Sequence, residues 1–423
     1  MNASFTYAIR YLINAECASP MRTGNAGNDI ERILTTHDGF AMLQGSSIAG
    51  ALKAWFGESE NAHKLFGNKD HESAIRVSDA VFDAGSVAVS RPRVCLDPRF
   101  GTSANKFDIT GLPAGAKCSF ELLWLGNQDD SKAAAEDIEA CLAAVQQGDI
   151  TFGAQRSNGY GRMLLSVQKR CYDLFNAEDR KAWLADQIDG AASVDLQTYT
   201  AKDIVFDVQA DIASILIKSS APERKSEKQN TQIHFTENGV PILPGSSLKG
   251  AMRAQMTKTA PFLSVSQQEL NGLLGRTAEG EDNGISGKII WTDAVADEKT
   301  NRAITVTRIR INRITGGVMQ RNMLTEEPIS GHWRWQIRVP SDQKCGAMMI
   351  LYALRDLGLG LYQLGGTQAV GRGAVRRLTV NIRCGKSTAV FTANAENGSL
   401  DLTDSENIVA VWEAAMGGNN DEA

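Results

Sequence analysis

The 423-residue chain lacks the features that mark membrane, secreted or zinc-scaffold proteins. It has no apolar run long enough to cross a bilayer, and its start shows no basic segment followed by an apolar core and a cleavage site. The seven cysteines are scattered without a C-x-x-C pair, and the five histidines show no ligand spacing. These absences argue against a zinc site and a disulfide framework, and they indicate a cytoplasmic protein that does not bind membranes.

A basic excess is also missing, which at first argues against a nucleic-acid partner. The formal net charge is −5, but the acids are concentrated at one end: after Lys386 there is no Lys or Arg. Without the acids of that end, 44 basic residues face 42 acidic ones. Because phosphate contacts depend on local charge, such a body can still carry a basic track. The acids after Lys386 are Glu396, Asp401, Asp404, Glu406, Glu413, Asp421 and Glu422.

What the chain does contain is an internal repeat. Residues 45–53 read GSSIAGALK, and residues 245–253 read GSSLKGAMR. Each segment joins a Gly-Ser-Ser entry to apolar residues at helical spacing and reaches a cation, Lys53 or Arg253. Serine is a good helix N-cap, and the free N–H groups at a helix N-terminus attract phosphate. We therefore predict a phosphate site at each helix start, with an ordinary capped helix as the alternative.

Three further landmarks recur in the same order, offset by roughly 200 to 217 positions. Such a duplication governs the choice of fold. Each copy reads strand, helix, strands, helix, strand, which predicts an α+β protein with two tandem ferredoxin-like or RRM-like domains carrying hairpin insertions. We assign 1–175 to the first domain, 176–200 to a linker, 201–384 to the second domain and 385–423 to an acidic C-terminal tail. The landmarks are Ser78-Asp79-Ala80 and Thr292-Asp293-Ala294, Arg91 to Arg93 and Arg308 to Arg310, and Gly153, Gly159 and Gly161 with Gly365, Gly371 and Gly373.

Two of these landmarks suggest contacts with RNA. Residues 300–325 hold five arginines and no acid, so an extended hairpin there could follow a phosphate backbone. The Gly-rich loops lack the Walker and Rossmann patterns but would allow close backbone approach. A solvated hairpin and a tight turn are the alternatives. The predicted RNA ligands are Gly45, Ser46, Ser47, Lys53, Arg91, Arg93, Arg156, Asn158 and Gly159, and in the second copy Gly245, Ser246, Ser247, Lys249, Arg253, Arg308, Arg310, Arg313, Gln368 and Arg372.

Together the duplicated landmarks resemble the RAMP superfamily, and more narrowly the two-domain backbone subunits of type III CRISPR effector complexes such as those of subtype III-D. The resemblance spans about residues 1–382. It implies an RRM-like palm that lines a guide RNA, and thumb-like hairpins that interrupt the guide–target duplex. It also implies complementary target RNA and other effector subunits as partners, and an acid before the Gly-Ser-Ser helix that supports metal-dependent cleavage of the target.

In the first copy that acid would be Asp29, sixteen residues before Gly45. A single carboxylate could bind Mg²⁺ or another divalent metal while the 2′-OH of the RNA attacks the adjacent phosphate. A turn aspartate is the alternative. In the second copy Gln229 stands at the equivalent place, with Glu223 and Glu227 nearby, so cleavage by that copy is doubtful.

Three functions remain open from the sequence. The first is a backbone subunit that cleaves target RNA at Asp29, and the second is a structural guide-binding or capping subunit without chemistry. The third, a free-standing ribonuclease that processes guide precursors, usually needs a histidine-centred acid–base pair, and no such pair is visible in the sequence.

Overall fold

The computed structural model describes residues 5–24, 33–96, 103–196, 199–218, 223–226, 229–276 and 283–417. None of the helices in these ranges is long and apolar enough to cross a membrane. The chain divides into two compact units. Unit 1 comprises Met1–Arg91, Asp108–Arg156 and Tyr160–Ala201, and unit 2 comprises Pro92–Phe107, Ser157–Gly159 and Lys202–Ala423.

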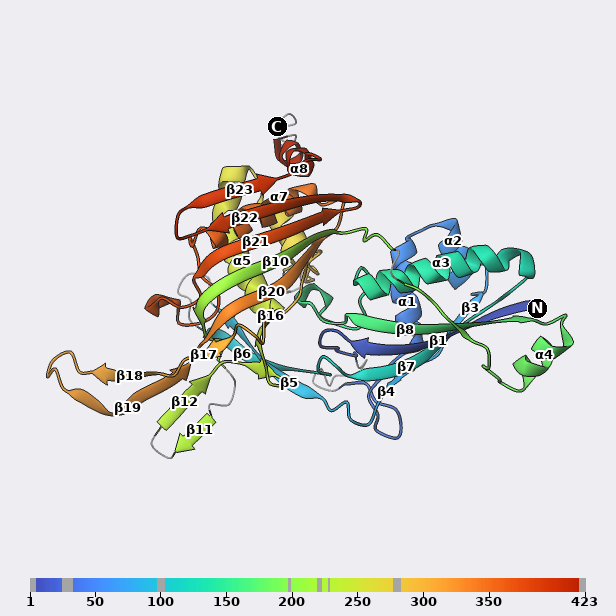
Figure 1. Ribbon diagram of the computed structural model, residues 1–423, viewed down its shortest axis with the longest axis horizontal. Helices are drawn as coiled ribbons and strands as arrows, with labels where there is room; N and C mark the ends of the chain where they lie inside the picture. Colours follow the sequence, from blue (N-terminus) through green and yellow to red (C-terminus); the bar gives the residue numbers. More distant parts are fainter. Residues whose placement is uncertain are drawn as a thin grey trace. The chain divides into compact units, whose positions relative to one another are not determined.

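The first copy of the repeat builds one sheet with helices on its buried face (Figure 1). Alternate residues of β1 (Ile9, Tyr11 and Ile13) are buried, as the period of a half-covered strand requires. The elements are β1 (Tyr7–Cys17), β2 (Met42–Leu43), α1 (Gly45–Phe56), α2 (Glu60–Phe66), β3 (Ile75–Val77), β4 (Ala80–Phe82), β5 (Val89–Leu96), β6 (Ser103–Gly111), β7 (Lys117–Gly126), α3 (Gln128–Gln147), the 3₁₀ turn η1 (Arg156–Asn158), β8 (Met163–Asp173), α4 (Ala177–Leu184) and β9 (Ala192–Ser193).

The sheet of unit 1 confirms the predicted ferredoxin-like topology. Its strands run in the order β2-β4-β7-β1-β8-β9, and β1 pairs antiparallel with both β7 and β8. The apolar stripe of α3, including Ile138 and Leu142, packs into the same core as β1. The apolar residues between Val77 and Phe82 predict a single strand, and this prediction is wrong, because the strand is interrupted at Ser78 and Asp79 and forms the separate strands β3 and β4.

The second copy repeats this plan with longer elements. Its sheet has the path β13-β14-β16-β20-β10-β21-β22-β23, so β10 occupies the central position that β1 has in unit 1. The elements are β10 (Ile204–Ile215), β11 (Glu223–Ser226), β12 (Gln229–Ile233), β13 (Thr236–Glu237), β14 (Val240–Leu243), α5 (Gly245–Thr259), η2 (Ala260–Leu263), α6 (Gln267–Leu274), β15 (Ile290–Trp291), β16 (Ala294–Ala296), β17 (Arg302–Ala303), β18 (Val306–Ile311), β19 (Val318–Glu327), β20 (Ile329–Val339), α7 (Lys344–Gly358), η3 (Gln368–Val370), β21 (Val375–Cys384), β22 (Ser387–Asn394), β23 (Ser399–Thr403) and α8 (Ile408–Gly417).

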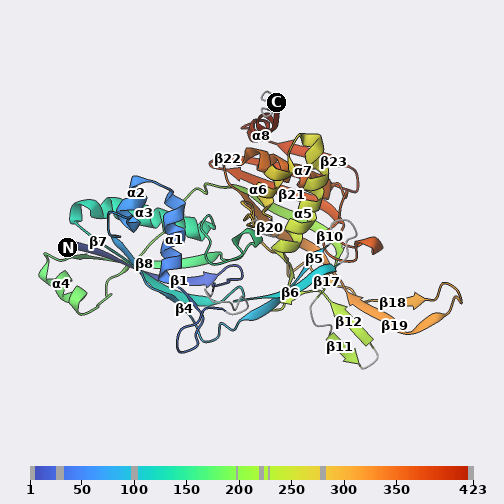
Figure 2. The same ribbon diagram turned by 180° about the vertical axis from the view of Figure 1, so that it is seen from behind.

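Helices α5, α6 and α7 cover one face of this sheet (Figure 2). The three apolar residues predicted on one face of the second Gly-Ser-Ser helix, Leu248, Met252 and Met256, are fully buried there. The opposite face of the sheet carries polar side chains such as Gln209 and Arg334. The core therefore lies between the helices and one face of the sheet, and the other face of the sheet is not covered by helices.

A separate hairpin, β18–β19, extends from the second copy (Figure 1). It belongs to a small sheet in the order β11-β12-β19-β18, in which β12 pairs parallel with β19. In the first copy β5 and β6 form a two-stranded ladder at the corresponding place. The hairpin insertions predicted from the arginine-rich stretches are thus present in both copies.

Two predicted boundaries differ from the structure. Residues 176–200, predicted as a linker, include α4 and β9, and β9 pairs with β8 at the edge of the first sheet. Residues 385–423, predicted as an acidic tail, include β22 and β23, which extend the second sheet, and α8, whose Trp412 is buried against Phe206. The prediction followed charge alone and overlooked the alternating apolar residues of β22.

Candidate nucleic-acid interface

Each Gly-Ser-Ser helix begins against an aspartate from a different landmark. The Gly45 N–H donates to Asp79 Oδ1 at 2.7 Å, and the Gly245 N–H donates to Asp293 Oδ1 at 2.7 Å. The predicted serine N-caps are wrong, because neither helix has a hydrogen bond from its own N-cap side chain. A carboxylate beside a helix N-terminus is favoured by the helix dipole, so the aspartate replaces the serine in this role.

The glycine of each motif is required by the same packing. A Cβ at Gly45 would lie 2.3 Å from the carbonyl oxygen of Val77, and one at Gly245 would lie 2.4 Å from that of Trp291. The hydroxyl of Ser78 accepts the Glu121 N–H at 2.9 Å, and that of Thr292 accepts the Gln336 N–H at 2.8 Å. In each copy the Gly-Ser-Ser and Ser/Thr-Asp-Ala segments therefore pack against each other and connect the start of the helix to the sheet.

The serines remain accessible at these helix starts. Ser46 and Ser47 are exposed, and Ser246 and Ser247 are half-buried. Their contact with RNA stays a prediction, now beside a carboxylate that already occupies part of the N-terminus.

Lys53 and Arg253, the cations at matching positions of the two helices, donate hydrogen bonds to the C-terminal end of the following helix. Lys53 Nζ donates to the carbonyl oxygen of Gly67 at 2.7 Å, just after α2. Arg253 Nη2 donates to the carbonyl oxygens of Leu274 and Gly275 at 2.7 and 2.6 Å, at the end of α6. Cations at a helix C-terminus satisfy its orphan carbonyls. This shared role explains why a cation recurs at this position, and it leaves these two side chains less available to phosphate.

A different residue of α5 has the character of an anion ligand. Burial, then the charge of Arg253 and then that of Arg93, lower the pKa of Lys249 to about 8. Its Nζ lies 3.4 Å from Ser157 Oγ. Arg93 and Ser157 both belong to unit 2, the unit that contains α5. Burial also lowers the pKa of Arg253. An anion placed among these cations would relieve their mutual repulsion.

The Gly-rich loops are tight turns with the same backbone conformation in both copies. All six landmark glycines have positive φ, between 75° and 87°. Gly161 and Phe152 are joined by a backbone hydrogen bond, as are Gly373 and Leu364, and a Cβ at either glycine would come within 2 Å of a carbonyl oxygen. Close approach is thus required by the turn itself.

Four of the predicted ligands in and around these loops differ in accessibility. Arg156 is exposed, Asn158 is half-buried and Gly159 is buried. Gln368 donates from Nε2 to two carbonyl oxygens of its own loop, those of Gln363 and Gly365. Only Arg156 therefore presents a freely accessible side chain among these four.

Several predicted arginine ligands have internal partners. Arg91 is 5% exposed and its guanidinium lies 5.6 Å from the centroid of the Tyr160 ring. Arg308 and Arg372 both pair with Glu326, which is completely buried; the Arg372 Nη2 to Glu326 Oε2 distance is 2.8 Å. These three arginines therefore have structural roles. The sequence pattern did not reveal Glu326 as their partner.

Other residues of the β18–β19 hairpin are exposed to solvent. Arg310 and Arg313 are exposed, and so are Ile309, Ile311 and Ile314, the last at 95%. Arg308 and Arg310 alternate with Ile309 and Ile311, so a basic face backs an apolar face. A hairpin with both faces accessible suits contact with the phosphates and bases of RNA.

The open sheet faces lack a base-stacking platform. Along the central strands β1, β7, β8, β10, β20 and β21, every aromatic residue is buried except Tyr7, which is half-buried. RRM domains bind single-stranded RNA by stacking bases on exposed sheet aromatics. Contact with RNA is therefore expected through helices and hairpins.

The predicted catalytic residue cannot be placed. Asp29 lies outside the described residues, as does Glu227, and the side chains of Glu223 and Gln229 are likewise not described. In the part of the chain that the structure describes, no group of three His, Cys, Asp or Glu residues is arranged to hold a metal ion. Dependence on Mg²⁺ therefore stays a prediction.

The comparison with protein families agrees with the duplication. The RAMP superfamily model matches residues 14–164 and 189–376, one region in each copy. A search of curated proteins finds no match. Since the two regions together cover most of the chain, the protein belongs to the RAMP superfamily and is a CRISPR-associated RNA-binding subunit.

Proposed function

We propose that this chain is a backbone subunit of a type III CRISPR interference complex of the III-D kind. It binds guide RNA along both copies of the repeat, presents it to complementary target RNA, and assembles with other effector subunits. The observation that carries the RNA contact is the cluster of Lys249, Arg253 and Arg93 on and beside α5, where burial and like charge lower the pKa of Lys249.

The physical argument concerns the energy of that cluster. Lys249 is desolvated and lies near two other cations, and its pKa is lowered first by burial and then by the charges of Arg253 and Arg93. A guide phosphate bound there would supply the missing negative charge in a partly water-excluded place, where charge-assisted hydrogen bonds are strong. Arg253 remains fixed to the end of α6, so Lys249 is the group expected to move to the phosphate.

We further propose that Asp29 supports cleavage of the bound target RNA. The support is its place sixteen residues before the first Gly-Ser-Ser helix, in a polar loop. In the proposed reaction the 2′-oxygen forms a bond to the adjacent phosphorus and the bond to the 5′-oxygen breaks. The proton lost from the 2′-OH is balanced by one gained on the leaving 5′-oxygen, so the products are a 2′,3′-cyclic phosphate and a 5′-OH.

The test uses the assembled complex with labelled target RNA and a divalent ion. Asp29→Ala should leave target binding nearly unchanged and remove one product band. Gln229→Ala is the matched control from the second copy and should remove none, because an amide cannot serve as an anionic ligand. Normal cutting by Asp29→Ala, or loss of a band in Gln229→Ala, would contradict the assignment.

The alternative is a purely structural guide-binding or capping subunit. It requires only the cationic residues around Lys249 and no carboxylate. Under this alternative every band survives in both variants, while Lys249→Gln still weakens RNA binding.

A further inference from the structure

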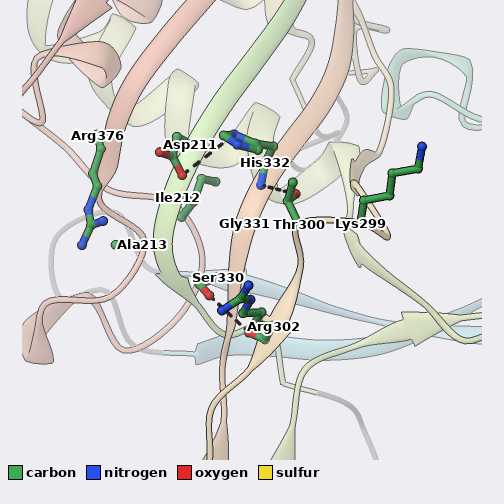
Figure 3. Close-up of a pocket in the computed structure, with 10 residues that line it drawn as sticks. All are labelled: Asp211, Ile212, Ala213, Lys299, Thr300, Arg302, Ser330, Gly331, His332 and Arg376. Carbon is green, nitrogen blue, oxygen red and sulfur yellow. Dashed lines mark hydrogen bonds and ion pairs between the residues drawn. The ribbon is translucent and has the colours of Figure 1, made fainter.

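A pocket of about 480 Å³ opens on unit 2, at the end of β10 and beside the start of β20 (Figure 3). Three basic side chains from two segments line it: Lys299 and Arg302, three residues apart just before and on β17, and Arg376 on β21. All three are exposed, and none of their side chains has a carboxylate partner among the described residues. Within the lining, Asp211 is the one acid.

The floor of the pocket is held by a dense set of hydrogen bonds. The His332 N–H donates to Thr300 Oγ1 at 3.1 Å, and the His332 carbonyl oxygen accepts the Asp297 N–H at 2.8 Å. Gly331 has φ of 144°, and a Cβ there would lie 2.9 Å from Asn301 Cα. The segment that presents Lys299 and Arg302 is therefore fixed against β20, which reduces the ordering cost of binding a ligand.

His332 and Asp211 lie opposite each other in the pocket, with His332 Nδ1 4.0 Å from Asp211 Oδ1 (Figure 3). A histidine beside an acid is the arrangement that a guide-processing ribonuclease would need, and 121 residues of sequence separate the two. Their distance exceeds the 2.6–3.2 Å of a working proton-transfer contact. The two side chains therefore form no direct hydrogen bond with each other in this structure.

Among the described residues of the first copy, the positions that match this lining carry different side chains. In the first copy the Asp83 N–H donates to the carbonyl oxygen of Lys117, and in the second copy the Asp297 N–H donates to the carbonyl oxygen of His332. Lys117 therefore occupies the position that corresponds to His332. Lys117 lies 3.8 Å from Glu16, which balances its charge. By strand register Leu164 pairs with Glu16 as Arg377 pairs with Asp211, and Arg376 lies at a register shift in β21 that β8 does not have. The cationic pocket is a property of the second copy.

We propose that this pocket binds a phosphomonoester group, the terminal phosphate of an RNA strand. The three cations and Asp211 give the lining a net charge of about +2. A phosphomonoester carries about −1.5 to −2 and so balances this charge better than an internal phosphodiester, which carries a single negative charge. The lining has no Phe, Tyr or Trp, and the hydroxyls of Thr300 and Ser330 donate to the carbonyl oxygens of Asp297 and Arg302, so the three cations are the groups that would bind the phosphate. This site is separate from the cluster around Lys249.

The test compares a short oligoribonucleotide carrying a 5′-phosphate with the same strand ending in 5′-OH and with a 3′-phosphate form. The wild-type chain should bind one phosphorylated form about tenfold more tightly than the hydroxyl form, as expected for charge-assisted hydrogen bonds. Arg302→Gln and Arg376→Gln should each remove most of that preference. Arg377→Gln, which removes the same charge from the next residue outside the pocket, should keep it.

Two further measurements separate this site from the others. Lys249→Gln should lower the affinity for the phosphorylated and hydroxyl strands by the same factor. If the guide-binding proposal failed, the preference for a phosphorylated end would still be present. A nucleoside 5′-monophosphate that competes as well as the phosphorylated strand would confirm the phosphate site but identify a free nucleotide as its source. Equal affinity for phosphorylated and hydroxyl strands, or a preference that survives the double variant R302Q/R376Q, would overturn the proposal.

Discussion

Removal of the Glu326 carboxylate is expected to destabilise unit 2 strongly. Glu326 lies near the end of β19 with none of its side chain exposed, and it pairs with Arg308 on β18 and with Arg372 in the Gly-rich loop. Their side chains are 34% and 7% exposed. This acid therefore joins the base of the hairpin to the turn that precedes β21.

The magnitude follows from which charges are left behind. Glu326→Ala would leave Arg372 buried without a counterion, and breaking a buried pair in this way costs about 3–5 kcal/mol. Arg372→Ala should cost less, because Glu326 keeps Arg308. Arg308→Ala should cost least, because its guanidinium is the most exposed of the three groups and the Arg372 pair remains.

Urea denaturation of the whole chain measures these losses, with the signals of Trp333 and Trp335 on β20 reporting on unit 2. For a urea m-value of about 2 kcal/mol/M, Glu326→Ala should lower the midpoint of unit 2 by about 2 M. Glu413→Ala, the same change at an exposed position of α8, should stay within about 0.5 kcal/mol of wild type. If Glu326→Ala behaved like Glu413→Ala, the triad would not stabilise the fold and the two arginines would be available to RNA.

Three other predictions follow from the site. With Lys249 at a pKa of about 8, its charge is lost as pH rises through 8, so RNA affinity should fall between pH 7 and 9; Lys249→Arg, which stays charged, should abolish this dependence in filter binding. Lys53→Ala and Arg253→Ala should each destabilise their own unit by about 1 kcal/mol in thermal unfolding, because each removes a helix C-terminal contact, while changing the salt slope of RNA binding by less than Lys249→Gln does. Deletion of residues 315–323 should preserve assembly but blur or abolish the position of a nearby target cut; a sharp and complete cut pattern would show that the hairpin is only a solvated loop.

The fold was predictable because the duplication repeats the central strands and the helices that cover them in the same order. A strand of period two and a helix of period 3.6 are each visible in the local sequence, as in β1 and α3. Polar composition misled at the edges: 176–200 and 385–423 were read as linker and tail, yet both contribute strands to sheets. The edge strand β23 is exposed on both sides, and it lies among acids that suggested a tail although Leu400 and Leu402 alternate with polar residues.

The site was less predictable because its residue types have two uses. Gly-Ser-Ser and Ser/Thr-Asp-Ala were read as separate motifs, although their exact co-repetition was the signal that Asp79 caps α1 and Asp293 caps α5. The arginines of the hairpin suggested contacts with phosphate, but Arg308 forms an ion pair with the buried Glu326, eighteen residues away in the sequence. No local pattern reveals such a partner, because it depends on which strand pairs with which.

The two copies differ in complementary ways, and this difference bears on how one chain could both hold and cut RNA. Lys249 has no counterpart in the first copy, where Ala49 occupies the same position of the helix. Conversely, Asp29 has no acidic counterpart in the second copy, where Gln229 stands. A carboxylate repels phosphate while a buried cation attracts it, so the copy with the added cation is suited to fixing the strand and the copy with the acid to acting on it. If guide binding and target cleavage are divided in this way, Lys249→Gln should weaken RNA binding without changing which bond is cut, and Asp29→Ala should stop one cut without weakening RNA binding.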